Sequence, residues 1–374
     1  MKKFKELFKD TQDTQVGKVI IGLIGGAFIG LLGARFLFLA NDLISIGDIL
    51  IMLISLVAFF VIGIIVHELG HLAFGLATGY NFSLFRLGSF AWFKENGKVK
   101  FTISKNFALG QCLLSPSESF ADFRFILYNL GGIIAQLLLC VLLFVFTTLL
   151  SGAGIARVAL LIGIIINIII ALLNLIPIKS LEAPNDGANI LEALKSKEAT
   201  YALYKMFDIH AKMMNGQTLR DFELHEFELS ENADLDNYLI AYMLMINVAW
   251  LMSHGKYEKA LTEYLRLDLE KIPNYYRDAA MMDLVYLYTV YVPDYEQARK
   301  LHDDKRLRAK WKMKFPSTLR ILAAYHFFVL KDKLGAMKLL ESAKEAVITL
   351  PNKGDKKMEM NELTSLEKKI SVNR

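Results

Sequence analysis

Long apolar runs fill the first half of this chain, whereas helical periodicity with many charged positions fills the second half. Four runs are long enough to cross a bilayer, because about twenty apolar residues in a helix span the hydrocarbon core. They extend approximately over residues 16–40, 49–76, 125–150 and 158–178. The pattern predicts an all-α integral membrane protein whose core of about four transmembrane helices occupies residues 16–190.

Residues 80–116, between the second and third runs, follow a different pattern. Two segments rich in aromatic and β-branched residues, FSLFRLGSFAWF and VKFTIS, flank an Asn96-Gly97 pair. Asn-Gly between such segments is typical of a tight β-hairpin. We therefore expect a hairpin at the membrane surface. Its free strand edge can bind an extended peptide through backbone hydrogen bonds, or the hairpin can be purely structural.

Residues 191–374 contain few prolines and little glycine, and apolar positions recur there with helical spacing. Three similar segments are centred on Tyr257, Tyr295 and Leu334, which are 38 and 39 residues apart. Each follows an aromatic-rich helical segment and precedes an amphipathic one. This arrangement predicts a tetratricopeptide-like helical domain that can bind a protein partner, and a plain helical bundle is the alternative.

Charge separates the two halves of the chain. Residues 1–187 contain 14 Lys and Arg with 11 Asp and Glu, and the remainder contains 29 and 27. The mean hydropathy of +0.35 therefore averages a lipid-embedded half and a soluble half. The net charge of +5 is small and spread over both halves, so the chain lacks the strong basic field that nucleic-acid binding requires.

Lysine and arginine also predict the orientation. They are frequent before residue 16 and between residues 86 and 124, whereas the loops at 41–48 and 151–157 contain only Arg157. The positive-inside rule then places both termini in the cytoplasm. Residues 1–15 alternate lysines with Phe and Leu, which indicates an amphipathic cytoplasmic segment. The first run has no signal-peptide cleavage site, and a bacterial inner membrane is the expected location.

The motif HELGH, residues 67–71, ends the second apolar run. Residues four apart share one face of a helix, so His67 and His71 can bind the same Zn²⁺. Glu68 can then accept a proton from the attacking water. This motif also occurs by chance on surface helices. Here it follows eighteen uncharged residues, where ionisable side chains are costly unless a partner such as a metal stabilises them.

A catalytic zinc site typically has three protein ligands and one open position. Four acidic residues are candidates for the third ligand: Asp186, Glu182, Glu95 and Glu118. Asp186 is favoured because the fourth run returns it to the leaflet that holds the histidines. Gly187, which follows, allows the backbone to turn toward the metal.

Together these residues resemble the site-2 protease family of intramembrane zinc metalloproteases. The resemblance covers about residues 16–190 and rests on HELGH, on GGIIAQ at 131–136, and on Asn174-x-x-Pro177 followed by Asp186-Gly187. It implies that His67, His71 and Asp186 bind zinc and that Glu68 activates water. Asn174 and Gln136 are candidates for substrate handling.

Two features depart from the family pattern. The segment from Asn174 to Asp186 is four residues longer, and the usual G-P-x-x-N appears as Gly132 to Gln136 without its proline. The expected activity is that of an intramembrane zinc endopeptidase that cleaves in or near membrane-spanning segments of proteins or peptide precursors. The alternative is a non-proteolytic membrane scaffold, adaptor or immunity protein that acts through its helical repeats.

Overall fold

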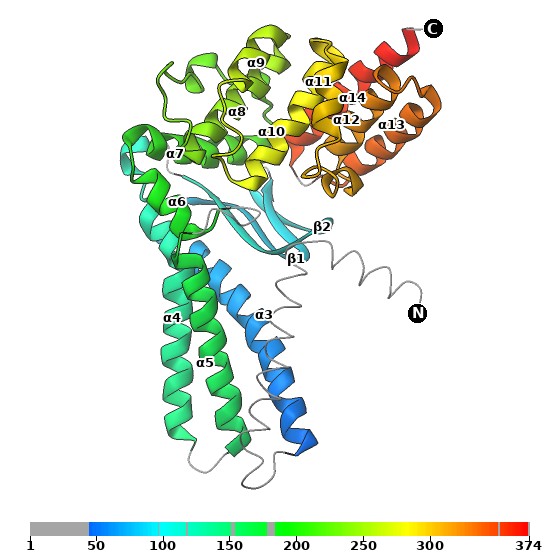
Figure 1. The fold of residues 1–374 in the computed structure, drawn as a ribbon. Helices are drawn as coiled ribbons and strands as arrows, with labels where there is room; N and C mark the ends of the chain where they lie inside the picture. Colours follow the sequence, from blue (N-terminus) through cyan, green and yellow to red (C-terminus); the bar gives the residue numbers. More distant parts are fainter. Residues whose placement is uncertain are drawn as a thin grey trace. The chain divides into compact units, whose positions relative to one another are not determined.

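The computed structural model describes residues 45–95, 97–116, 119–150, 154–177, 184–350 and 352–372 (Figure 1). The predicted amphipathic segment 1–15 and the predicted span at 16–40 lie outside these residues. In chain order the elements are α3 (Ile46–Ala77), β1 (Asn81–Glu95), β2 (Lys98–Ser115), α4 (Phe125–Leu149), α5 (Gly154–Leu175), α6 (Asp186–Ala193), α7 (Lys197–Met214), α8 (Tyr238–Ser253), α9 (Tyr257–Tyr264), α10 (Asn274–Tyr286), α11 (Tyr295–His302), α12 (Pro316–Phe328), α13 (Lys333–Val347) and α14 (Lys353–Val372).

Three of the described helices, α3, α4 and α5, are long and apolar enough to cross a membrane. Their ends differ from the predicted ones for local reasons. Helix α3 begins three residues early because Ser45 and Asp48 cap it reciprocally: the Asp48 N–H donates to Ser45 Oγ (3.1 Å) and the Ser45 N–H to Asp48 Oδ2 (2.9 Å). Helix α5 ends at Leu175, two residues before Pro177, because the residue before a proline disfavours helical geometry.

The contacts divide the chain into two compact units, residues 1–63 with 136–171 and residues 64–135 with 172–374. In the described part of the first unit, α3 and α5 approach closely at two glycines. A Cβ on Gly63 would lie 2.7 Å from Asn167 Oδ1, and one on Gly163 would lie 2.8 Å from the Phe59 ring. Small residues thus allow these two helices to pack together, as is common between membrane helices.

The second unit begins with the end of α3 and the predicted hairpin. Strands β1 and β2 pair antiparallel, and Glu95 lies opposite Lys98 at the closed end of the hairpin. Gly97 has a φ of 78°, a left-handed conformation that glycine adopts without strain. The prediction of a β-hairpin is confirmed.

Helices α3 and α4 make backbone contact within this unit. A Cβ on Gly70 would lie 2.3 Å from the Gly131 carbonyl oxygen, and one on Gly131 would lie 2.7 Å from the Gly70 carbonyl oxygen. Gly132 is equally constrained, because a Cβ there would lie 2.5 Å from His67 Nδ1. The glycine pair at 131–132 therefore lets the helix that carries HELGH lie directly against α4.

Helices α6 to α14 cover the C-terminal part of the chain, where the sequence predicts a helical domain at residues 191–374. Aromatic-rich helices α8, α10 and α12 are each followed by a shorter or amphipathic helix, α9, α11 and α13, against which they pack. These second helices begin at Tyr257, Tyr295 and Lys333, close to the three predicted repeat centres. The assignment of these helix pairs to the tetratricopeptide class stays a prediction.

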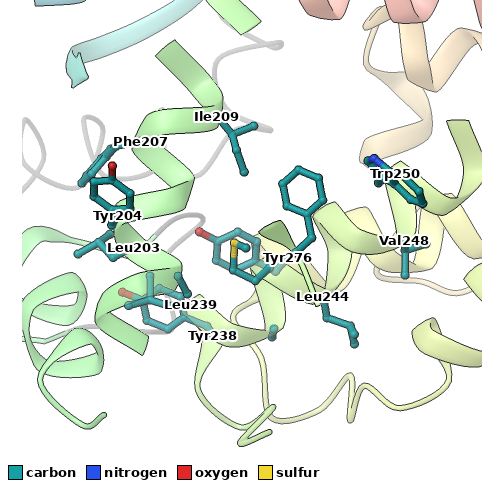
Figure 2. Close-up of a cluster of buried hydrophobic side chains, with 14 of the residues drawn as sticks. Leu203, Tyr204, Phe207, Ile209, Tyr238, Leu239, Leu244, Val248, Trp250 and Tyr276 are labelled. Carbon is teal, nitrogen blue, oxygen red and sulfur yellow. The ribbon is translucent and has the colours of Figure 1, made fainter. Parts of the chain in front are cut away.

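One hydrophobic core joins the hairpin, the start of α4 and the helical domain. It contains Cys112 from β2, Tyr128 from α4 and Phe207 from α7, together with side chains from α8 and α10. Figure 2 shows the part of this core that includes Phe207, Tyr238 and Tyr276. The helical domain thus packs on the hairpin and on the start of α4, in addition to its connection through the chain.

We predict that Gly131→Ala lowers the stability of the purified protein by about 1–3 kcal/mol, because the added methyl group has to displace the α3 backbone. Thermal unfolding in detergent measures this. Gly154→Ala is the matched control, because no atom lies within 4 Å of a Cβ at that position. Equal thermal stability of Gly131→Ala and the wild type would show that α3 and α4 do not need this close approach.

Candidate metal centre

Three side chains from two segments bring ligand atoms to one point. His67 and His71 come from α3, and Asp186 is the first residue of α6. Their atoms are separated by 3.0 Å (His67 Nε2 to His71 Nε2), 3.2 Å (His67 Nε2 to Asp186 Oδ2) and 3.4 Å (His71 Nε2 to Asp186 Oδ2). This group can hold a metal ion, and both histidines are buried.

The chemistry of these atoms favours a cation between them. His71 Nδ1 donates a hydrogen bond to the Tyr128 carbonyl oxygen (2.8 Å), so a neutral His71 presents a lone pair at Nε2. The Asp186 Oδ2 atom is also an acceptor. It is buried, and among the described residues no group lies in hydrogen-bond geometry to it. The spacing fits a metal, because tetrahedral ligands about 2.0–2.1 Å from zinc lie about 3.3–3.4 Å apart.

Tyr128 connects the histidine to three other parts of the unit. Its carbonyl oxygen orients His71, and its hydroxyl donates to the Cys112 carbonyl oxygen in β2 (2.7 Å). Its ring stacks on Tyr80 at 5.1 Å between centroids and meets the edge of Phe207 at 5.3 Å. Such partners of a ligating histidine fix its tautomer and its ring orientation.

Asn185 fixes the position of Asp186. Its Nδ2 donates to the carbonyl oxygens of Leu173 (2.6 Å) and Ile176 (2.7 Å) at the end of α5, and its Oδ1 accepts from the Ala188 N–H (3.0 Å) as the N-cap of α6. The sequence predicts that Asp186 and Gly187 lie in a turn, and this prediction is wrong. Because Asn185 caps a helix there, both residues lie in the first turn of α6.

Gly187 is required by a close approach. A Cβ at this position would lie 2.0 Å from the Leu175 carbonyl oxygen, so only glycine lets α6 pack against the end of α5. Burial alone would raise the pKa of the Asp186 carboxyl, but the His71 and His67 side chains lower that pKa well below its usual range. Asp186 therefore presents a carboxylate to the site.

Glu68 is buried on the same turn of α3 as the two histidines, with 8% of its surface exposed. Strand β2 lies directly against it, because a Cβ on Gly110 would be 2.5 Å from Glu68 Oε1. A carboxylate beside a group of potential metal ligands, with one face covered by a strand, can exchange a proton with a molecule bound in the site.

The ligand atoms open into a cavity of about 330 Å³. Helices α3, α4, α5, α6, α7 and α10 line it together with β2, and all of the lining residues belong to the second unit. Asn174, a predicted substrate-handling residue, lines this cavity. Gln136, the other one, is buried on α4 in the first unit and is not among the lining residues.

The other candidates for the third ligand have different positions. Glu95 lies at the hairpin turn, as expected, and forms ion pairs with Lys100 and with Lys353 of α14. Glu118 and Glu182 lie outside the described residues. Within the described part of the chain, only Asp186 completes a group of three potential ligands with the two histidines.

Comparisons with known proteins add no assignment. No family model, curated protein or solved structure matches this chain. The function of the site therefore has to be argued from its residues and their geometry.

We predict that Asp186→Asn abolishes tight metal binding. The substitution replaces the anionic carboxylate ligand with a neutral amide and leaves the two histidines unchanged. Metal content after purification and chelator competition measure the loss. Asp122→Asn, which removes an exposed acid in the short turn before α4, is the control and should retain the metal. Full metal content in Asp186→Asn would exclude Asp186 as a ligand.

A second prediction concerns Asn185, which does not itself reach the ligand point. Asn185→Ala should weaken metal affinity by about 10- to 100-fold, as is usual when a partner that positions a ligand is lost. Asn185→Ser retains a capping oxygen but cannot donate to both α5 carbonyl groups. If Asn185→Ser binds metal as tightly as the wild type, the α5 hydrogen bonds do not position Asp186.

Proposed function

We propose that this protein is an intramembrane zinc endopeptidase that hydrolyses peptide bonds in or near membrane-spanning segments. One observation carries the proposal. At the end of a membrane-length helix, two histidines and a carboxylate converge at 3.0–3.4 Å with Glu68 beside them. Two nitrogen ligands, one oxygen ligand and an open cavity match a catalytic zinc site. The motif resemblance to site-2 proteases agrees with it.

The chain's own residues have separate roles in this reaction. When bound, zinc supplies a Lewis acid that polarises the peptide carbonyl and makes water more acidic. Glu68 accepts a proton from the water whose oxygen adds to the carbonyl carbon. As the C–N bond breaks, Glu68 returns that proton to the leaving amine nitrogen. Tyr128 and Asn185 hold His71 and Asp186 in place throughout.

The surroundings of the site favour an extended peptide as the substrate. A helical segment hides its carbonyl groups in its own hydrogen bonds, so it must unwind before it is cleaved. Residues 110–113 of β2 line the cavity, and in the described sheet β2 pairs on one side only, with β1. The other edge can bind an unwound segment by backbone hydrogen bonds.

The same proposal includes the location and the partners. The protein lies in a bilayer, in a bacterial inner membrane with both termini cytoplasmic, and its substrates are membrane-embedded proteins or peptides. The helical domain can recruit a protein partner. A scaffold without proteolytic activity would have no use for a buried glutamate that faces the metal ligands.

We predict that Glu68→Gln retains the metal and the fold but lowers proteolysis by at least about 10²- to 10⁴-fold, because the amide cannot accept the proton. Release of peptides from membranes of cells that carry each variant, followed by assay of purified protein, measures the effect. Glu223→Gln, on the exposed surface of the helical domain, is the control. Wild-type proteolysis by purified Glu68→Gln would remove Glu68 from the mechanism, and an inactive wild type would favour the scaffold.

A further inference from the structure

Two helices of the helical domain form one wall of the metal cavity. Met206 and Phe207 of α7 and Tyr276 of α10 line the same cavity as His67 and Glu68. All five residues belong to the same compact unit. The helical domain therefore contributes side chains to the site, in addition to any surface with which it binds partners.

The wall is fixed to both metal-binding segments. Phe207 meets the Tyr128 ring edge-on, and the Tyr128 carbonyl oxygen holds His71 of α3. On the other side, Tyr276 stacks on Tyr238 with 5.8 Å between ring centroids (Figure 2). The Tyr238 hydroxyl donates to Asn189 Oδ1 (2.7 Å) in α6, the helix that Asp186 begins. A rigid wall of this kind is preorganised for a ligand in the cavity.

Tyr276 has a hydroxyl group without a protein partner. The residue is only 8% exposed, yet its hydroxyl makes no hydrogen bond with any residue that the structure describes. Buried tyrosine hydroxyls are usually hydrogen-bonded. Burial and the neighbouring Tyr242 and Tyr275 raise the pKa of the phenol, so the group remains an O–H donor at neutral pH. The partner that remains for the Tyr276 hydroxyl is a hydrogen-bond acceptor that occupies the cavity.

We propose that the wall formed by α7 and α10 is a substrate subsite and that the Tyr276 hydroxyl donates a hydrogen bond to a carbonyl oxygen of an extended peptide. This inference rests on the proposed function, because it assumes that a peptide occupies the cavity. It assigns substrate recognition to the helical domain at the site itself. The apolar side chains of Met206 and Phe207 then contact the side chain of the same bound segment.

Hydroxamates provide the test, because the hydroxamate group chelates a metal independently of any peptide bound beside it. The full chain is purified in detergent and loaded with zinc. The affinities of acetohydroxamate and of a dipeptide hydroxamate are then measured for the wild type, Tyr276→Phe and Tyr275→Phe. Tyr275 is the matched control, because it neighbours Tyr276 but is 53% exposed and does not line the cavity. Zinc content and thermal stability show whether each variant is intact.

We expect Tyr276→Phe to bind the dipeptide hydroxamate about three- to tenfold more weakly, the effect of one lost hydrogen bond. Its affinity for acetohydroxamate should not change, and Tyr275→Phe should match the wild type with both compounds. Equal dipeptide affinity in Tyr276→Phe and the wild type would overturn the inference, as would a wild type that binds only acetohydroxamate. Zinc-loaded wild type that binds neither compound would instead contradict the proposed function, and the subsite with it.

Discussion

The close contact between α3 and α4 is the constraint on which the candidate metal centre depends. Gly70 and Gly131 meet backbone to backbone, and Gly132 leaves room for the His67 ring. At any larger separation, the Tyr128 carbonyl oxygen could not reach His71 Nδ1 at 2.8 Å. The contact that packs the two helix backbones together therefore also orients His71 as a potential metal ligand. Apolar helices in lipid need such small residues because no hydrophobic effect drives them together.

Sequence reasoning was most successful where the signal is local. Three membrane-length helices, the hairpin around residues 96–97 and the histidine pair each depend on residues fewer than about forty positions apart, and periodicity or turn chemistry predicts them. The ends of α3 and α5 were missed by a few residues. The hydropathy pattern masked the Ser45–Asp48 cap at the start of α3, whereas Pro177 is a visible stop signal that ends α5 two residues before it.

The residues that sequence reasoning missed act through contacts that no local sequence pattern encodes. Tyr128 lies 57 positions from His71, and its role depends on a backbone carbonyl group that no side-chain pattern encodes. Asn185 gave a weak signal as a possible helix cap before Asp186, but its bonds to α5 required knowledge of where that helix ends. Tyr276 could not be recognised at all, because only the packing of α10 on α8 turns it toward the cavity.

The energetics of the ligands connect the metal to the fold of the whole unit. Without a cation or protons, two imidazole lone pairs and a carboxylate oxygen would face one another at 3.0–3.4 Å in a buried place, which is electrostatically unfavourable. The folded chain holds them there through Asn185, Tyr128 and the glycine contacts. Part of the folding free energy therefore maintains an arrangement that a bound cation or a proton stabilises. Because α6 and α7 pack on the same core, a metal ion bound at Asp186 would also stabilise the helical domain that forms the cavity wall.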